Sequence, residues 1–493
     1  MRTAVLSLVL ILLPQDESLI DIRVTEGQKA IPFRIHLRDP KGKPVQGPGH
    51  PFWRDHFVAD GRVRLSLPPG DYDAEIERGP EYTSVSRRIR VGSEAGRETT
   101  VELQRLANLA AAGWWSGDLH VHRPLADIEL LMKAEGLNVA PVITWWNDKD
   151  LWNGKEIPGE QVVRFDGHRF YSKMGGEDER EGGAVLYYGL AKPLAIRGAS
   201  REYPSPIQSL LEAKKETGVH VDIEKPFWWD VPVWVASGQV DTIGLANNHL
   251  CRSVMSETEA WGRPRDAARL PPPLGNAYWS QEIYYQILNA GLRIPPSAGS
   301  ASGVLPNPVG YNRVYVHLDG EPTYEKWFAG LRAGRSFVTN GPLLRVQANG
   351  EDPGHVFKSE KTLSIDLSAT LEGRERVSVL EIIRDGRVER RVPVQDPLGK
   401  IEFSSSGWFL VRSIADNAQT FRFASTAPFY VEIGGTTSRI SKASTRFFLD
   451  WIDERMARVP LKLKEPQELD EVLRWHRQAK EWWTRLASQA NAE

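Results

Sequence analysis

Three features that often reveal the class of a protein are scarce in this chain. It has a single cysteine, Cys251, among 493 residues, which excludes an internal disulfide framework and any cysteine-rich zinc site. Its 62 basic and 64 acidic residues give a net charge of -2, so the charge pattern does not point to nucleic acid. No stretch beyond the first residues is long and apolar enough for a membrane helix. We therefore expect no nucleic-acid partner and no stable membrane insertion.

Length and tryptophan content are the features that stand out. A chain of 493 residues exceeds one ordinary core, and about three domains is the expectation for this length. The composition, 41% hydrophobic and 26% charged, is typical of a folded globular protein. The 17 tryptophans would mostly be core residues, although such an excess also suits flat ligands such as sugar rings.

The first residues are typical of an export signal. Met1 and Arg2 precede an apolar run over 4–13, which is too short to span a bilayer, and a polar stretch follows. We predict a signal peptide over residues 1–15 and an exported, periplasmic or extracellular, mature protein.

The spacing of apolar residues divides the rest of the chain into predicted domains. Short alternating strands with Pro/Gly turns predict a β-sandwich over 16–107, and its turn at 67–72 resembles those of carboxypeptidase-regulatory-like, Ig-like modules. Strands alternate with helical patterns over 108–341, which indicates an α/β barrel or layered sheet with ligands at the carboxyl ends of its strands. A second β-sandwich is predicted over 342–436, and helices that pack on the core over 437–493.

One stretch carries the pattern of a metal site. Asp118, His120 and His122 alternate along a predicted strand that we place at 119–122, so the three side chains would share one face. Two imidazoles and a carboxylate that converge at a strand end suit a divalent metal. The alternative is a strand whose two histidines are only packed and hydrogen-bonded.

With Gly117 in front of it, this stretch resembles the opening motif of the PHP metallohydrolase superfamily. The Ig-like module, the strand–helix region and the stretch 331–341 are similar to the CehA/McbA-like branch. That resemblance implies a distorted (β/α)7 barrel that binds two or three divalent metals and hydrolyses phosphate, carbamate or related esters through metal-activated water.

The chain departs from that family at several ligand positions. Where the family has Thr-Asp-His, this chain has Thr-Trp-Trp at 144–146, and Glu177 is present but the histidine of Gly-Gly-His is replaced at 182–184. The family's Ala-His-Pro appears as Glu-Lys-Pro at 224–226, and its Gly-Ser-Asp-Ala-His as Gly-Ser-Ala-Ser-Gly at 299–303. The usual multinuclear cluster cannot be rebuilt from these residues.

A second polar run offers replacements. His220, Asp222 and Glu224 alternate along a predicted strand, and His249 follows the end of the next one; buried polar groups on such strands need partners. A single ion, zinc or manganese, could be bound by five residues: His120, His122, Glu177, Glu224 and His249. Lys225 could substitute for the charge of a lost metal or hold an anionic substrate. The alternative is a metal-free, salt-bridged network of Lys225, Glu224 and Asp222.

Two tryptophan pairs suggest a binding surface. Trp145-Trp146 and Trp228-Trp229 are doubled, and strand alternation prevents both members of a pair from facing the same core. If they line the mouth of the site, they could stack on a sugar or an aromatic ligand.

These observations lead to two hypotheses of different classes. The first is an exported, metal-dependent PHP-type hydrolase of an ester, carbamate or phosphoester, in which Asp118 or Asp222 orients a ligand or acts as the base, with Lys225 beside them. The second is a binding protein with little or no activity that holds a small-molecule, glycan or anionic ligand at a degenerate site without a metal. A glycosidase that uses Asp222 and Glu224 is disfavoured, because neighbours on one strand face cannot flank a bond from opposite sides.

Overall fold

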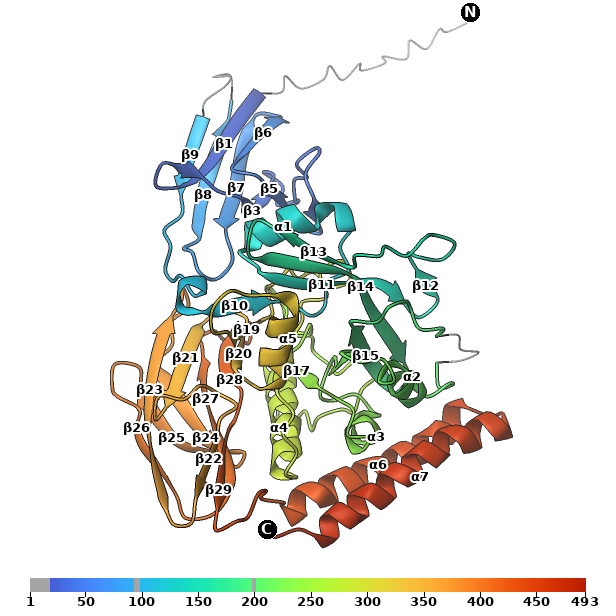
Figure 1. The fold of residues 1–493 in the computed structure, drawn as a ribbon. Helices are drawn as coiled ribbons and strands as arrows, with labels where there is room; N and C mark the ends of the chain where they lie inside the picture. The colour runs from blue at the N-terminus through green and yellow to red at the C-terminus, as the bar shows by residue number, and fades with distance from the viewer. Residues whose placement is uncertain (1–17, 93–97, 197–200) are drawn as a thin grey trace, which may run out of the picture. The chain divides into compact units, whose positions relative to one another are not determined.

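The computed structural model describes residues 18–92, 98–196 and 201–493. The predicted signal peptide at 1–15 lies outside the described residues. The chain divides into two compact units, one of Met1–Glu77 with Ser84–Gln104 and one of Arg78–Thr83 with Arg105–Glu493. Both units are rich in strands, and all helices among the described residues lie in the second unit (Figure 1). Among the described residues no helix is long and apolar enough to cross a membrane.

The first unit consists of two sheets, as expected for a sandwich-like module. One sheet contains four strands: β1 (Ser18–Glu26), β2 (Lys29–Ala30), β6 (Arg62–Leu67) and β9 (Glu98–Glu102). The other contains five: β3 (Phe33–Arg38), β4 (Phe52–Trp53), β5 (His56–Ala59), β7 (Gly70–Glu77) and β8 (Val85–Val91). Both contribute fully buried side chains, among them Ile22 and Ile35, and β6 alternates strictly between exposed and buried residues.

The first part of the second unit contains strands with helices between some of them, and the five strands β11 to β15 (139–188) follow one another without a helix. The strands are β10 (Trp114–Gly117), β11 (Val139–Trp146), β12 (Lys149–Asp150), β13 (Val162–Phe165), β14 (Arg169–Arg180), β15 (Gly183–Tyr188), β16 (His220–Ile223), β17 (Thr242–Ala246), β18 (Pro296–Ala298), β19 (Arg313–His317) and β20 (Ser336–Thr339). The helices are α1 (Ile128–Glu135), α2 (Pro206–Ala213), α3 (Val231–Ala236), α4 (Gly275–Asn289) and α5 (Tyr324–Arg332), with 3-10 turns at η1 (Ala110–Ala112) and η2 (Leu125–Asp127).

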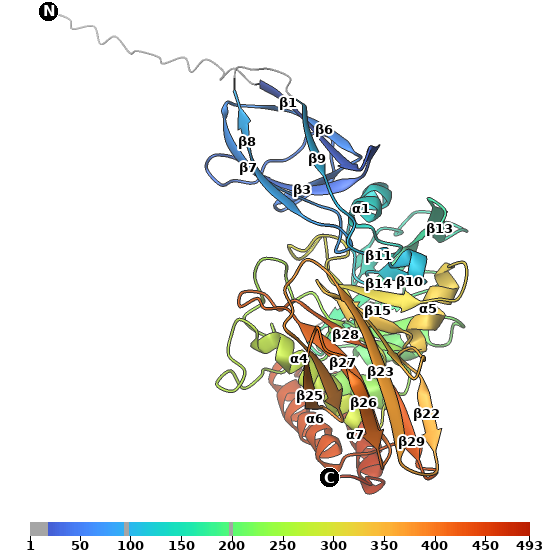
Figure 2. The same cartoon turned by 90° about the vertical axis from the view of Figure 1, so that its left-hand side faces the viewer.

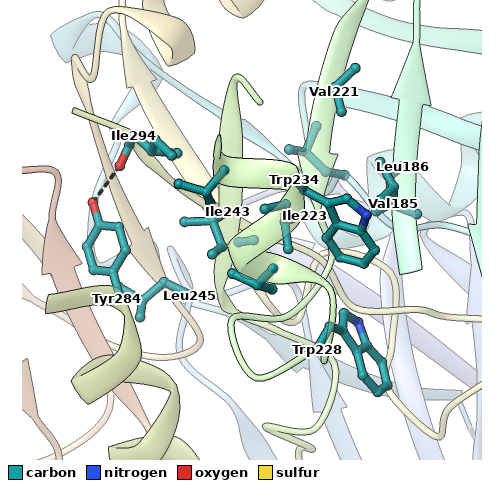
Figure 3. Packing of buried hydrophobic residues seen from close by; sticks show 14 of the residues in the cluster. Val185, Leu186, Val221, Ile223, Trp228, Trp234, Ile243, Leu245, Tyr284 and Ile294 are labelled. Carbon is teal, nitrogen blue, oxygen red and sulfur yellow. Dashed lines mark hydrogen bonds between the residues drawn. The ribbon is translucent and has the colours of Figure 1, made fainter. Parts of the chain in front are cut away.

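The strand pairings position the site. From β10 the pairing passes to β11, β14, β15, β16, β17 and β18. The chain just after β10 contacts both ends of this series. At the β18 end, the N–H of Leu119 donates to the carbonyl of Ala298 over 3.0 Å. Val121 forms one bridge to Val142 on β11 and one to Ser302, just after β18. Figure 3 shows Trp228 and Trp234 among the aliphatic side chains that β15, β16 and β17 contribute to the core.

The strand predicted at 119–122 is wrong in its bounds, since β10 ends at Gly117. The reason is local: the carboxylate of Asp118 accepts the N–H of His120 over 3.0 Å, and such a bond competes with the ladder of a sheet. His120 and His122 therefore lie on a loop next to the sheet, where only Val121 keeps a bridge.

The remaining chain is a second set of strands closed by two helices. The strands are β21 (Leu343–Ala348), β22 (Val356–Ser359), β23 (Leu363–Glu372), β24 (Val379–Arg384), β25 (Arg387–Pro393), β26 (Gly399–Phe403), β27 (Gly407–Ile414), β28 (Phe423–Thr426) and β29 (Phe429–Ile433). They form two packed layers, one of β21, β23 and β26 and one that contains β27 and β28 (Figure 2). Because β20 pairs with β28, one sheet continues across the boundary that we predicted at 341.

The predicted C-terminal helices are α6 (Lys442–Lys462) and α7 (Pro466–Ser488). They form a hairpin that runs along α3 (Figure 1). The indole of Trp483 is fully buried and donates to the carbonyl of Pro232 in α3 over 2.9 Å. The apolar stripe of this segment is therefore a packing surface, as its spacing predicted.

Candidate metal centre

Asp118 holds the loop that carries the two histidines. Its buried carboxylate accepts the backbone N–H groups of His120, Ser300 and Gly310 and the hydroxyl of Ser300. Burial raises the pKa of Asp118, although these four bonds act in the opposite direction. Four donors occupy the acceptor positions of a carboxylate, so we revise its predicted catalytic role to a positioning one.

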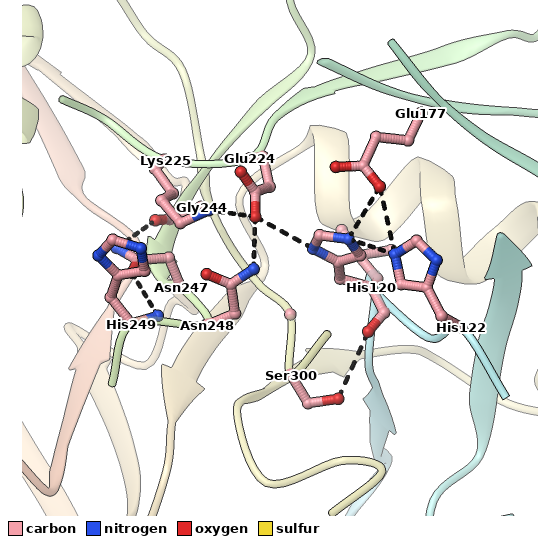
Figure 4. Close-up of polar contacts among 12 residues, drawn as sticks. His120, His122, Glu177, Glu224, Lys225, Gly244, Asn247, Asn248, His249 and Ser300 are labelled. Atoms are coloured by element: carbon pink, nitrogen blue, oxygen red, sulfur yellow. Dashed lines mark hydrogen bonds and ion pairs between the residues drawn. The ribbon is translucent and has the colours of Figure 1, made fainter. Parts of the chain in front are cut away.

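His120, His122 and Glu177 converge (Figure 4). Nε2 of His120 lies 2.8 Å from Nε2 of His122, and the carboxylate of Glu177 lies 3.3 Å from the first and 3.2 Å from the second. All three ligand atoms fall within 4.8 Å of one another. Glu177 reaches this point because β14 pairs in parallel with β11, with Glu177 opposite Trp146. This trio matches the core of the predicted ligand set.

The three side chains of the trio shift one another's pKa values, and His120 is the one whose pKa is raised. Burial alone would lower its pKa, but the carboxylates of Glu177 and Glu224 outweigh burial and raise the pKa of His120 to about 10. Burial would raise the pKa of Glu177, but the two histidines lower it to about 2. For His122, burial dominates and lowers the pKa. Without an ion, His120 is thus an imidazolium between two carboxylates.

The trio also fits one divalent ion. Two imidazole nitrogens and one carboxylate oxygen are the donors that zinc and manganese take from proteins. Two nitrogens on one tetrahedral ion are about 3.3 Å apart, so the observed 2.8 Å between the histidines requires the rings to separate by only a fraction of an ångström. Three protein ligands leave a fourth position for water or substrate, which is the pattern of catalytic rather than structural sites.

Glu224 contacts the trio from the other side of the His120 ring. Its carboxylate lies 3.3 Å from Nδ1 of His120, the nitrogen that points away from the other two side chains. We therefore revise its predicted role from ligand to orienting group, because a carboxylate on the second nitrogen fixes the tautomer of a metal-binding histidine. Glu224 is itself anchored by Trp228, whose indole N–H donates to it over 2.9 Å, and by Asn248 and Lys225.

Lys225 belongs to this anchor and does not face a substrate. Its side chain is buried, its ammonium group is paired with Glu224, and it lies 4.5 Å from the centre of the Trp228 ring. This pairing disfavours the predicted role of Lys225 in holding an anionic substrate, because its charge is already matched inside the protein. The Lys225–Glu224 pair of the predicted metal-free network is present.

His249 lies outside the trio. Figure 4 places it beyond Glu224 and Lys225 as seen from His120, and its ring packs 5.3 Å from that of Phe227. Burial and the nearby Lys225 lower the pKa of His249 to about 3. Its predicted role as a ligand is wrong, because its backbone N–H bonds to the side chain of Asn247 in a turn that directs the ring away.

Asp222 binds to hydroxyl groups in the sheet below. It accepts hydrogen bonds from Thr242 and Ser297, and Thr242 also lies 2.8 Å from Nε2 of His220. Burial raises the pKa of Asp222 to about 7. Its hydrogen-bond partners are thus residues of β17 and β18, not the histidines of the trio, which disfavours the predicted catalytic role of Asp222.

Three of the four predicted ligand-stacking tryptophans are core residues. Trp145, Trp228 and Trp229 are at most 4% exposed. Strand alternation does not apply to Trp228 and Trp229, because they lie in the loop between β16 and α3. Trp145 lies on β11 and fits because its neighbour at 176 is a glycine: a Cβ added there would lie 1.7 Å from the indole. Trp146 is half-buried, with its ring 5.2 Å from that of His122, and remains a candidate for ligand contact.

Glu179 was missed from the sequence. It is half-buried two residues after Glu177 on β14, and burial with the nearby Glu177 and Glu224 carboxylates raises its pKa to about 7. The alternating Glu-Asp-Glu at 177–179 was the available signal, since residues two apart on a strand share a face.

A second group with metal-ligand chemistry lies in the first unit. Ligand atoms of His36, Asp55 and His56 fall within 4.8 Å of one another. Nε of Arg34, however, donates to Nε2 of His36 over 3.1 Å, so the ring proton of a neutral His36 sits on Nδ1, which faces Asp55 at 3.2 Å. That nitrogen is occupied by its proton, which makes this group a hydrogen-bonded network and a useful control.

No protein-family model matches this chain, and no curated protein matches it. Solved structures show only faint similarity. The four N-terminal Ig domains of Dscam1 isoform 1.9 give a TM-score of 0.13 at 10% identity, with 85% of this chain and 98% of that one covered. An FMN-binding beta-glucuronidase from Facaelibacterium prausnitzii L2-6 gives 0.14 at 9% identity, with 86% and 74% covered. Similarity at this level supports no family and no activity, and the chemistry of the site rests on its own geometry.

Proposed function

We propose that the second unit is a metal-dependent hydrolase of the PHP type, which acts on an ester, a carbamate or a phosphoester. In this proposal the series from β10 to β18 is the remnant of the family's distorted barrel, a view supported by the pairings of Leu119 and Val121 with both of its ends. The observation that carries the proposal is the convergence of His120, His122 and Glu177; an ion with three protein ligands would have a fourth position for water or substrate.

The roles of the residues follow from their contacts. A divalent ion held by His120, His122 and Glu177 would polarise the substrate and lower the pKa of a bound water. With an ion bound, Glu224 would accept the Nδ1–H of His120, which leaves Nε2 as the coordinating nitrogen on the side of Glu177. Trp146 lies beside His122, with ring centroids 5.2 Å apart, and could contact a bound substrate. The chain thus needs one ion, in contrast to the two or three of the family it resembles.

A non-catalytic binding protein is the second candidate. The observation in its favour is that the buried charges at the site balance one another without an ion. Glu177, Glu224, Lys225 and a protonated His120 sum to no net charge, so the buried group is electrically complete without an ion. A divalent cation would have to displace the proton of His120. Metal content therefore separates the two candidates.

We expect about one zinc or manganese ion per chain by elemental analysis of the purified full-length protein. His120→Ala should lose the ion, because one of three ligands is removed and binding weakens severely. His36→Ala is the matched control, since it removes a histidine from the other candidate group and should leave the metal content unchanged. An ion-free wild-type protein, or loss of the ion from His36→Ala alone, would refute the hydrolase proposal.

A further inference from the structure

A separate cavity lies among the C-terminal strands of the second unit. It has a volume of about 240 Å³ and is lined by side chains of β10, β19, β21 and β23. Its floor is polar. On β21 and β23, Arg345 pairs with Thr370 and Gln347 with Ser368, and residues directly opposite each other on antiparallel strands share a face. Four hydrogen-bonding side chains therefore lie side by side.

The wall of the cavity is a fixed imidazole. The ring of His317 stacks on that of Trp114, with centroids 5.0 Å apart and an interplanar angle of 27°, and Nδ1 of His317 is paired with Asp352. The hydrogen bond to Asp352 raises the pKa of His317, and burial opposes it only in part. Because both partners are held in place, the wall is preorganised.

Each ionisable side chain of the cavity has a partner within the protein. Arg345 is bonded to Glu372 over 2.8 Å, and His317 is paired with Asp352, so no cationic side chain of the lining is left unpaired to hold an anion. The groups that remain, Gln347, Ser368 and Thr370, can each donate and accept a hydrogen bond. Hydroxyl groups of a ligand have the same double capacity.

We propose that this cavity is a binding site for an uncharged, hydroxyl-rich ligand the size of a single sugar residue. The volume of 240 Å³ is below the roughly 300–1,000 Å³ of sites for drug-sized molecules, which limits the occupant to one ring. Mixed donors and acceptors without net charge select a neutral polyol over a carboxylate or a phosphate. The site is independent of the metal centre and of the hydrolase proposal.

Saccharide titrations of the full-length protein test this site. The probes are glucose, galactose, N-acetylglucosamine and myo-inositol, the charged analogue glucuronate, and cellotetraose, with binding followed by calorimetry and saturation-transfer NMR. We expect at least one neutral probe to bind with a Kd on the order of 1 mM, as expected for about a dozen non-hydrogen atoms. Equal affinity for a monosaccharide and the tetramer identifies a free sugar as the ligand, and tighter binding of the tetramer identifies a glycan chain.

Two matched variants locate the binding. Ser368→Tyr fills the cavity from an exposed position on β23 and should weaken binding at least 10-fold, and Gln347→Ala should weaken it several-fold. Ser364→Tyr is the control: the same substitution on the same strand and face, at another exposed serine that does not line the cavity. Absence of binding by every neutral probe, binding of glucuronate alone, or an equal loss in Ser364→Tyr and Ser368→Tyr would overturn the proposal.

Discussion

Replacement of Arg455 by methionine is expected to lower the free energy of unfolding by about 3–5 kcal/mol. The guanidinium group is almost fully buried on α6, where it bonds to both oxygens of Glu202 and to Asp230. Asp230 is also 3.2 Å from Nε2 of His476 on α7. Without Arg455 two carboxylates are left in the interior without their main counter-charge, and the helical hairpin loses its anchor on the core.

The measurement is urea unfolding at pH 7, followed by circular dichroism and by tryptophan fluorescence. Arg446→Met on the same helix is the matched control, since Arg446 forms an exposed i,i+4 pair with Asp450, and such pairs contribute at most about 1 kcal/mol. A loss in Arg455→Met no larger than that in Arg446→Met would show that the buried network contributes little.

The same network makes an acid-sensitive contribution to stability. Arg455 and His476 hold the pKa of Asp230 well below its usual range, despite the opposing effect of burial. A depressed carboxylate pKa stabilises the fold above the unfolded pKa of about 4, and that contribution is lost as the pH falls below it. Wild-type stability should therefore drop between about pH 4 and pH 2, and the slope should be shallower in Arg455→Met. Parallel slopes would contradict this assignment.

Glu177→Gln is expected to abolish both metal binding and hydrolysis. The amide keeps the shape of the side chain but removes the only anionic ligand of the trio. Metal activation supplies several kcal/mol to such reactions, so its loss corresponds to about a 1,000-fold decrease in kcat/KM. The assay uses p-nitrophenyl acetate, p-nitrophenyl phosphate and a naphthyl carbamate, each with and without added zinc or manganese.

Glu179→Gln is the matched control for this substitution. It lies on the same strand, makes the same chemical change, and is not one of the three converging side chains. We expect Glu179→Gln to retain the ion and Glu177→Gln to lose it. Equal metal content in the two variants would exclude Glu177 as a ligand.

The sequence predicted the local elements well because each carries its own signal. Gly136 ends α1 in the left-handed conformation that favours glycine, and the apolar stripes of α6 and α7 identified their packing faces. Trp145 shows the limit of such patterns on a strand, since alternation distinguishes its two faces but only tertiary packing decides whether both are covered. Trp228 lies in a loop, so alternation did not apply to it.

Of the candidate site, the sequence predicted the contacts between residues close together in the chain but not those that depend on tertiary packing. The spacing of His120 and His122 is local, so their proximity followed from the sequence. The position of Glu224 on the far nitrogen of His120 depends on how β16 lies relative to the loop after β10, and no spacing reports this. His249 follows a strand end, where a ligand was expected, but its backbone N–H donates to the side-chain oxygen of Asn247. The turn at 247–249 that this bond closes directs the ring away from the trio.

Anomalous scattering at the zinc and manganese edges, from crystals grown with each ion, tests the central claim most directly. The account predicts one strong peak per chain within coordination distance of Nε2 of His120, Nε2 of His122 and the Glu177 carboxylate, with Glu224 on the opposite side of the His120 ring. A peak at His36 and His56 instead, or none at either group in the presence of excess metal, would contradict it.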